Sequence, residues 1–321
     1  MKALKITGKI LLWIAIVLVA LLVLLWIGVT AIYFDYFNNS SAEFVIPGLS
    51  DNYVPQGFDL VEEDGTYLMC GYMSDGSASR IYVRSADGDT FYTQLRFADG
   101  RDYTRHAGGL CHNGEYLYLA GSNGVEVFSF ADVMDGGDAT QIGTIPAGHD
   151  IAYCYFYNGY LLAGNFYYPE TYETPENHRI TTPAGDNNVA IITIYQADPN
   201  EELGIDPTPV AAISTREKVQ GICFTGDDEI VLSTSYSVKS SYLYYYTLDT
   251  ERAGTVEILD TEVPLYYLDS SNLTKSVKMP PMSEELVYQD GKILVMCESA
   301  CNKYIFGKLI RGWQVYGYDP G

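Results

Sequence analysis

The residues best placed for chemistry flank the strands of five similar segments of the chain. Each segment consists of an apolar burst, a polar turn and a second apolar burst. The residues that precede the first burst or follow the second are the candidate ligand-binding side chains. They are Gln56, His106, Tyr153, Gln220 and Glu284 before the first burst, and Tyr72, Ser122, Asn165, Ser235 and Glu298 after the second.

Carboxylate, amide and imidazole groups in this set suggest two kinds of chemistry. Glu284, Glu298 and Asn165 carry the oxygen ligands that a hard cation such as calcium prefers, so they are the candidate metal ligands. His106 is the candidate general base. Such groups also satisfy backbone N–H groups, and a single histidine with no identified nucleophile is more often structural. No catalytic residue is therefore assigned.

The signatures of several familiar enzyme classes are missing from the sequence. There is no HExxH, no GxSxG, no Walker phosphate loop, no GxGxxG and no CxxC pair. These absences disfavour zinc proteases, α/β-hydrolases, nucleotide hydrolases, dinucleotide-dependent enzymes and thioredoxin-like proteins.

The five segments that carry the candidate residues are typical of β-hairpins. They begin at Pro55, His106, Ala152, Val219 and Ser283, and their turns contain Asp-Gly, Asn-Gly or Asp-Asp pairs. These residue types tolerate the positive φ angles of tight hairpin turns. The repetition of one supersecondary unit predicts a repeat architecture.

Further strands extend each hairpin. A third strand follows every hairpin and a fourth follows in the first four repeats, which makes the four-stranded blade of a propeller. The last repeat has no room for its fourth strand, whereas an unpaired strand begins at Ala42. The sequence thus predicts an all-β, five-bladed β-propeller in which the N-terminal strand closes the last blade. A β-sandwich of many short strands is the alternative.

The N-terminal part of the chain is predicted to anchor this domain in the plasma membrane. Residues 10–34 carry no charge and are long enough to cross a bilayer as a helix. Lys2, Lys5 and Lys9 precede this segment and Asp35 follows it, so residues 1–9 are expected in the cytoplasm. Residues 35–42 form a predicted stem, and residues 43–321 form the extracellular propeller. A cleaved signal peptide is the alternative to this uncleaved signal-anchor, although its apolar region is usually shorter.

The charge of the exported part excludes one class of partner. Acidic residues number 41 and basic ones 19, for a net charge of −22. Every acidic residue follows the apolar segment while three lysines precede it, so the exported part carries 16 − 41 = −25. Nucleic acid, itself polyanionic, is therefore an unlikely partner.

Six cysteines permit disulfides in an extracellular protein, but the sequence selects no pairing. Cys111, Cys154 and Cys223 fall within strand patterns, where a free cysteine behaves as a small apolar residue.

An insertion in the third repeat, residues 166–187, is aromatic, acidic and proline-containing. We expect it to project from the candidate binding face, either as a lid or partner contact or as a disordered surface excursion. Aromatic rings on this face are candidates for stacking on sugars. They are Tyr72, Tyr153, Phe166, Tyr167 and Tyr236.

At the motifs VPQGF, RHAGGL, KVQGI and PPMSEELV…CESA, the chain resembles bacterial membrane-anchored β-propellers of unassigned function. It is more distantly similar to propellers of the gluconolactonase and arylesterase type, over about residues 43–321. The lactonase resemblance implies a calcium ion at the mouth of the channel that activates an ester. Glu284 matches a glutamate at the start of an inner strand in those proteins, whereas their Asn and Asp ligands have no match here.

These observations favour a surface-displayed, non-catalytic binding or scaffold propeller. Its expected ligand is a polysaccharide, an envelope component or a partner protein. The alternative is a calcium-dependent lactonase or esterase of the propeller type.

Overall fold

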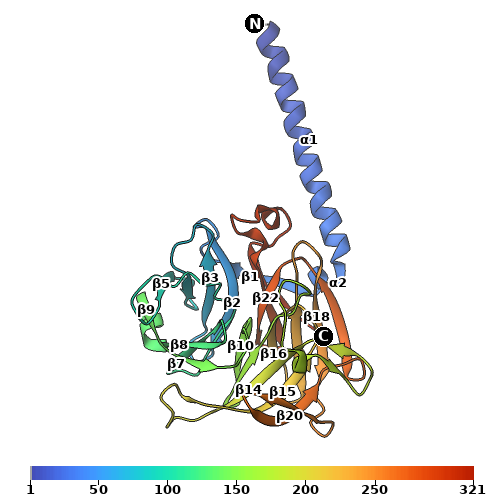
Figure 1. Ribbon diagram of the computed structural model, residues 1–321. Coiled ribbons are helices and arrows are strands. Elements are labelled where there is room, and N and C mark those ends of the chain that lie inside the picture. Colours follow the sequence, from blue (N-terminus) through green and yellow to red (C-terminus); the bar gives the residue numbers. More distant parts are fainter. Residues whose placement is uncertain (1) are drawn as a thin grey trace.

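The computed structural model describes residues 2–321, and it consists of a long N-terminal helix followed by a β domain (Figure 1). Helix α1 (Lys2–Ile32) projects away from the β domain. Within it, the 25 residues Gly8–Ile32 are long and apolar enough to cross a membrane. The single apolar N-terminal helix predicted from the sequence is therefore present.

A second, short helix connects α1 to the β domain. Residues Phe34–Asn38 form α2, and strand β1 (Ser40–Val45) begins directly after it. Tyr36 and Phe37 are buried against Tyr318 and Tyr316. Residues 35–42, the predicted stem, thus include α2 and the start of β1 and pack against the β domain.

The β domain is built from antiparallel four-stranded meanders, in which each strand pairs with the next. The first comprises β2 (Tyr53–Val61), β3 (Thr66–Met73), β4 (Arg80–Arg84) and β5 (Thr90–Arg96). The second comprises β6 (Leu110–His112), β7 (Tyr116–Gly121), β8 (Gly124–Ser129) and β9 (Gly137–Pro146), with α3 (Phe130–Asp135) between the last two. The third comprises β10 (Tyr153–Tyr157), β11 (Tyr160–Gly164), β14 (Ala190–Ala197) and β15 (Ile205–Thr215).

Two further four-stranded sheets follow, and the last of them joins the first strand of the domain to its final three. The fourth comprises β16 (Val219–Phe224), β17 (Glu229–Thr234), β18 (Ser241–Thr247) and β21 (Leu273–Met279). The last sheet has the order β22 (Ser283–Gln289), β23 (Lys292–Cys297), β24 (Gln314–Tyr318) and β1. The register of the β1–β24 pair runs from Ser40 opposite Tyr318 to Val45 opposite Gln314.

Several short strands and 3₁₀ helices are added to the meanders. Strands β12 (Ile180–Thr181) and β13 (Asn187–Asn188) form a small ribbon in the insertion, next to the 3₁₀ helix η1 (Glu176–His178). Strands β19 (Gly254–Ile258) and β20 (Thr261–Tyr267) extend the third meander through a parallel β15–β20 pair. The 3₁₀ helices η2 (Glu298–Ala300) and η3 (Ile305–Leu309) lie between β23 and β24.

The innermost strands of the meanders pack around a common centre. Strand β2 contacts β6 and β22, β10 contacts β6 and β16, and β16 contacts β22. This cyclic arrangement is that of a β-propeller and not of two facing sheets, so the β-sandwich alternative is wrong. The predicted all-β propeller class is confirmed.

Two of the hairpin turns show why the sequence folds this way locally. Asn158 and Gly159 both have positive φ angles, of 49° and 79°, and so do Asp290 and Gly291, at 51° and 80°. Two successive positive φ angles define the turn that best matches the twist of a hairpin.

All six cysteines are free and buried. Cys111, Cys154 and Cys223 therefore behave as the small apolar residues that their strand patterns indicate.

Candidate functional site

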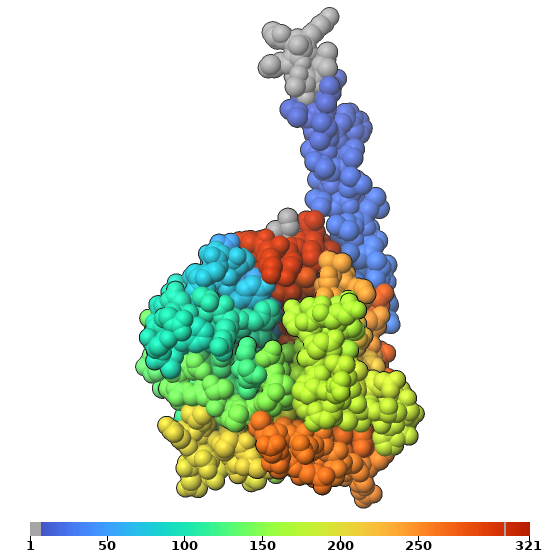
Figure 2. All heavy atoms as spheres, viewed as in Figure 1, coloured from blue at the N-terminus to red at the C-terminus, as the bar shows by residue number. Residues whose placement is uncertain are grey.

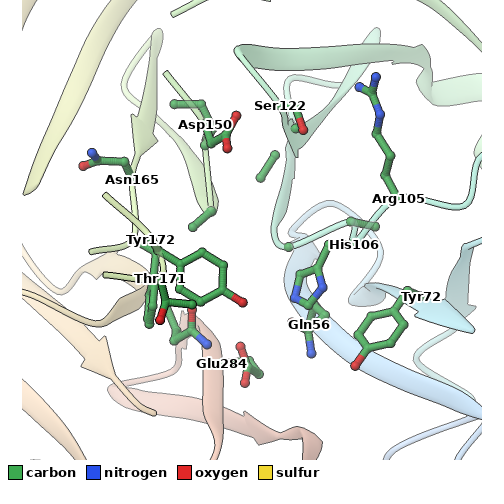
Figure 3. Close-up of a pocket in the computed structure, with 18 of the residues that line it drawn as sticks. Gln56, Tyr72, Arg105, His106, Ser122, Asp150, Asn165, Thr171, Tyr172 and Glu284 are labelled. Atoms are coloured by element: carbon green, nitrogen blue, oxygen red, sulfur yellow. The ribbon is translucent and has the colours of Figure 1, made fainter. Parts of the chain in front are cut away.

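A cavity of about 1020 Å³ lies at the end of the domain where the innermost strands begin. Nine of the ten candidate residues line it, and Figure 3 shows several of them approaching one another from separate strands. They are Gln56, Tyr72, His106, Ser122, Asn165, Gln220, Ser235, Glu284 and Glu298.

Tyr153 is the exception among the candidates. Its side chain is fully buried and its ring lies directly over Gly164, in the space that a side chain at that position would need. Tyr153 is thus a core residue and its assignment to the binding face is wrong. The glycine opposite leaves room for this ring, so it folds inward and does not line the cavity.

Two glutamate–glutamine pairs occupy the cavity floor. The Gln56 amide donates from Nε2 to Glu298 Oε2 at 2.8 Å, and to the Pro55 carbonyl at 2.8 Å. Burial raises the pKa of Glu298 to about 7, against the opposing effects of Gln56 and Lys303. Near neutral pH the carboxyl can therefore both accept and release a proton.

Glu284 is more deeply enclosed than Glu298. Burial raises its pKa well above the usual range, the charges of Glu298 and Glu285 add to this, and a hydrogen bond from Gln220 opposes it. These effects stabilise the protonated form of Glu284, which can donate a hydrogen bond to a ligand, relative to that of an exposed carboxyl.

The three predicted metal ligands line one cavity, where each already has a hydrogen-bond partner. Asn165 Oδ1 accepts the backbone N–H of Ile191 at 2.7 Å. Burial raises the pKa of both Glu284 and Glu298, and the charge of Lys303 opposes this at Glu298. Within residues 2–321, no group of three or more His, Cys, Asp and Glu side chains converges. Calcium binding by Glu284, Glu298 and Asn165 stays a prediction.

His106 lies in the cavity with its ring stacked on that of Tyr72, at a centroid distance of 4.8 Å (Figure 3). The surrounding protein lowers the pKa of His106, and the charge of Lys303 lowers it further. The imidazole is therefore neutral at neutral pH and can exchange hydrogen bonds with a polar ligand.

The insertion at residues 166–187 forms one wall of the cavity. Phe166 and Tyr172 from this segment line the cavity together with Tyr236, and the Phe166 and Tyr172 rings meet edge to face at 5.4 Å. In Figure 2 the insertion appears in yellow-green and stands out on the visible face of the β domain. Of the five rings predicted to stack on sugars, Tyr72, Phe166 and Tyr236 line this cavity, whereas Tyr153 and Tyr167 do not.

Two histidines attach the insertion to the body of the domain. His178, in η1, meets His149 edge to face at 4.9 Å, and both are buried. Burial lowers the pKa of His149 to about 4, and burial and the charge of His149 lower the pKa of His178 to about 3. Both imidazoles are neutral at physiological pH.

The sequence reasoning missed the carboxylate at the centre of the domain, Glu285. Its Oε2 accepts the backbone N–H groups of Phe58 and Leu110, each at 2.9 Å, and its Oε1 accepts that of Cys154 at 3.0 Å. Glu285 thus joins β22 to β2, β6 and β10. Burial raises its pKa, although the three N–H donors act in the opposite direction.

The repeats did contain a signal for this residue. The positions equivalent to Glu285 are Gly57, Gly109, Cys154 and Gly221, which are all small. A Cβ atom on Gly109 would overlap the Glu285 carboxylate, and one on Gly221 would overlap its Cα. One large side chain among small ones at a position that converges on an axis indicates which residue fills the centre.

Comparison with known proteins gives only distant similarity. No protein-family model and no curated protein matches the chain. Among solved structures, it is similar to a proposed gluconolactonase, with a TM-score of 0.41 and 12% identity over 88% of this chain and 91% of that one. It is also similar to the PQQ-bound aldose sugar dehydrogenase of Streptomyces coelicolor, with a TM-score of 0.45 and 11% identity over 87% and 96% of the two chains. It is similar as well to a chain of the nidogen–laminin complex, with a TM-score of 0.38 and 11% identity over 77% of this chain and 73% of that one. The distant similarity to gluconolactonase-type propellers is thus confirmed, and at this level of overlap none of these proteins indicates a function for the chain.

Proposed function

We propose that the chain is a five-bladed propeller whose last blade is completed by β1. The pairing of β1 with β24 and the cyclic contacts of β2, β6, β10, β16 and β22 support this. We further propose that α1 is an uncleaved anchor, with the N-terminus in the cytoplasm and the propeller outside. The lysines that precede the apolar segment and the acidic residues that follow it support this orientation.

The proposed role of the propeller is to bind a neutral, polyhydroxylated ligand, such as a segment of an envelope polysaccharide, without transforming it. The observation that carries this proposal is the composition of the cavity. Its floor presents amide and carboxyl groups, and the rings of Phe166, Tyr172 and Tyr236 form a wall on one side. Sugars are typically bound by stacking on aromatic rings together with hydrogen bonds to amides and carboxyls. The volume, about 1020 Å³, lies at the upper end of ligand pockets, which hold ~300–1,000 Å³.

A hydrolase is the second candidate function, because of Glu298. A carboxyl group with a pKa of about 7 is matched to general acid–base work at neutral pH, and it lies in the same cavity as the neutral His106. No nucleophile contacts either group among the described hydrogen bonds.

Binding of the full-length protein in detergent to an array of bacterial glycans tests the first proposal. Tyr172→Ala and Tyr236→Ala should each weaken the signal at least ~10-fold, because each removes a stacking surface. Tyr160→Ala is the matched control, since this exposed tyrosine at the start of β11 does not line the cavity and should bind as the parent does.

A parallel screen against lactones and aryl esters, with and without chelator, tests the second candidate. Turnover that Glu298→Gln or Glu284→Gln abolishes would overturn the binding-only role. Chelator-sensitive turnover would also support calcium binding by these residues.

A further inference from the structure

The foot of the anchor helix contacts the β domain at a defined place. The Tyr33 hydroxyl, one residue beyond α1, shares a hydrogen bond with Ser240 Oγ at 3.2 Å, and Lys278 Nζ lies 5.6 Å from the centre of the Tyr33 ring. Arg311 lies 4.2 Å from the centre of the Trp26 ring, further up the helix. Figure 1 shows α1 meeting the β domain near α2 and β18.

These contacts set the depth of the neighbouring residues. The 25-residue span Gly8–Ile32 makes a helix of about 37 Å, longer than the ~30 Å hydrocarbon core of a bilayer. If α1 spans a bilayer, Tyr33 lies in the headgroup layer. Ser240 and Lys278, which contact Tyr33, must then lie at that level too.

A second cavity, of about 660 Å³, opens beside this contact. Four of its lining residues are cationic: Arg216, Lys218, Lys239 and Lys278. Glu217 is the acidic residue among the described lining residues, and it is paired with Lys218. The cavity is thus cationic in a chain whose net charge is −22.

The arrangement of these cationic side chains suits the binding of an anion. The Arg216 guanidinium lies over the Tyr244 ring, 3.6 Å from its centre, and its Nε is buried with no hydrogen-bond partner. Stacking fixes the plane of a guanidinium and leaves its edge free to bind the oxygens of a phosphate. Lys239 and Lys278 are both exposed and can close on the same group.

We propose that this second cavity binds the phosphate of an anionic lipid headgroup in the membrane that holds the anchor. The proposal rests on the membrane anchorage proposed above. The contact between Tyr33 and Lys278 brings the cavity to the level of the lipid phosphates, and the positive charge selects anionic headgroups. Ser235 and Tyr236 line both cavities, so a bound headgroup would fix the first cavity relative to the bilayer surface.

Native mass spectrometry of the full-length protein in detergent, with added phosphatidylglycerol or phosphatidylcholine, measures this binding. Phosphatidylglycerol should be retained and phosphatidylcholine should not. The double substitution Lys239→Gln/Lys278→Gln should weaken phosphatidylglycerol binding about 30-fold, since each lysine near an anionic group contributes a factor of roughly five.

The matched control is Lys275→Gln/Lys292→Gln, which removes the same charge toward the opposite end of the sheets. This variant should retain the lipid as the parent does. Equal retention of both lipids, or equal loss in the two double variants, would overturn the proposal. So would equally tight binding of inorganic phosphate, because the site would then serve a free anion.

Anchorage is tested separately on the same samples. An intact mass that includes residues 1–34, together with resistance of membrane-bound protein to alkaline extraction, supports the anchor. A shortened mass would defeat the anchor, while loss of lipid selectivity in a full-length, extraction-resistant protein would defeat only the headgroup site.

Discussion

The Glu285 carboxylate accepts the backbone N–H of Leu110 at 2.9 Å, although 175 residues separate the two. It accepts N–H groups from Phe58 and Cys154 as well, so one side chain satisfies buried donors on three other strands. Glu285 is therefore the structural centre of the domain, while its neighbour Glu284 faces the cavity.

Glu285→Ala should destabilise the domain by about 3 kcal/mol or more, because it leaves three buried N–H groups unpaired. Glu285→Gln should cost less, since its carbonyl oxygen can keep some of these bonds. Chemical denaturation with a fluorescence readout measures both. Glu63→Gln, an exposed residue at a hairpin turn, serves as the control, and a loss of less than 1 kcal/mol for Glu285→Ala would contradict this role.

Gly109→Ala should destabilise the domain because its new Cβ would overlap the Glu285 carboxylate and the backbone of Tyr153. Backbone atoms cannot yield as a flexible side chain does, so a cost of about 2 kcal/mol is expected. Gly226→Ala is the matched control, since a Cβ there has open space. Equal denaturation midpoints for the two variants would show that the packing around Gly109 has room for a Cβ atom.

The pH dependence of stability should contain a contribution from Glu298. Its folded pKa is about 7, above an unfolded value of 4.5, so the native state holds the proton more tightly. This contribution is present below pH 4.5 and is lost as the pH rises through 7. After allowance for the partial exposure of Glu298, this contribution to the free energy of unfolding is about 2 kcal/mol.

Glu298→Gln removes this titration while its carbonyl oxygen can still accept the Gln56 bond. The variant should therefore be more stable than the parent at pH 8 and about equal to it at pH 5. Thermal unfolding at the two pH values measures the difference. If stability declined equally with rising pH in both proteins, a group other than Glu298 would dominate the pH dependence.

Acid should loosen the insertion through His149 and His178. Their pKa values, about 4 and about 3, lie below the unfolded value of 6.5, so the stability due to the neutral rings is present above pH 6.5. It is lost progressively as the pH falls toward 4. Hydrogen exchange of residues 166–187, corrected for the intrinsic pH effect, should therefore accelerate between pH 7 and pH 4.5.

His178→Phe keeps an aromatic ring but cannot be protonated, so it should reduce this acceleration. The rest of the domain provides the internal control, because exchange in β16 and β17 should not change. Acceleration of the same size in His178→Phe would exclude the histidine pair as its cause.

The repeats predicted the hairpins well because their signals are local. An apolar burst and a turn such as Asn158-Gly159 define strands without reference to distant residues. The similarity of the repeats also placed nine candidates at one cavity, since the loops at one end of the inner strands of a propeller converge on its axis. Tyr153 does not line this cavity because its ring packs over Gly164, its partner on the next strand of the same hairpin, and a strand pattern does not show which way a tyrosine ring turns.

The second cavity had no counterpart in the sequence analysis. Arg216 follows β15 of the third meander and Lys278 lies in β21 of the fourth, and only the fold brings both to one cavity. Similarly, the sequence did not reveal that the backbone N–H of Ile191 donates to Asn165 Oδ1.

The pairing of β1 with β24 also affects how the protein matures. Ser40 is synthesised long before its partner Tyr318, so their ladder forms only after the strands between them have been made. Until then the edge of β1 that pairs with β24 has no partner strand. The serines and Glu43 of β1 make that edge polar, which disfavours pairing with a strand of another nascent chain.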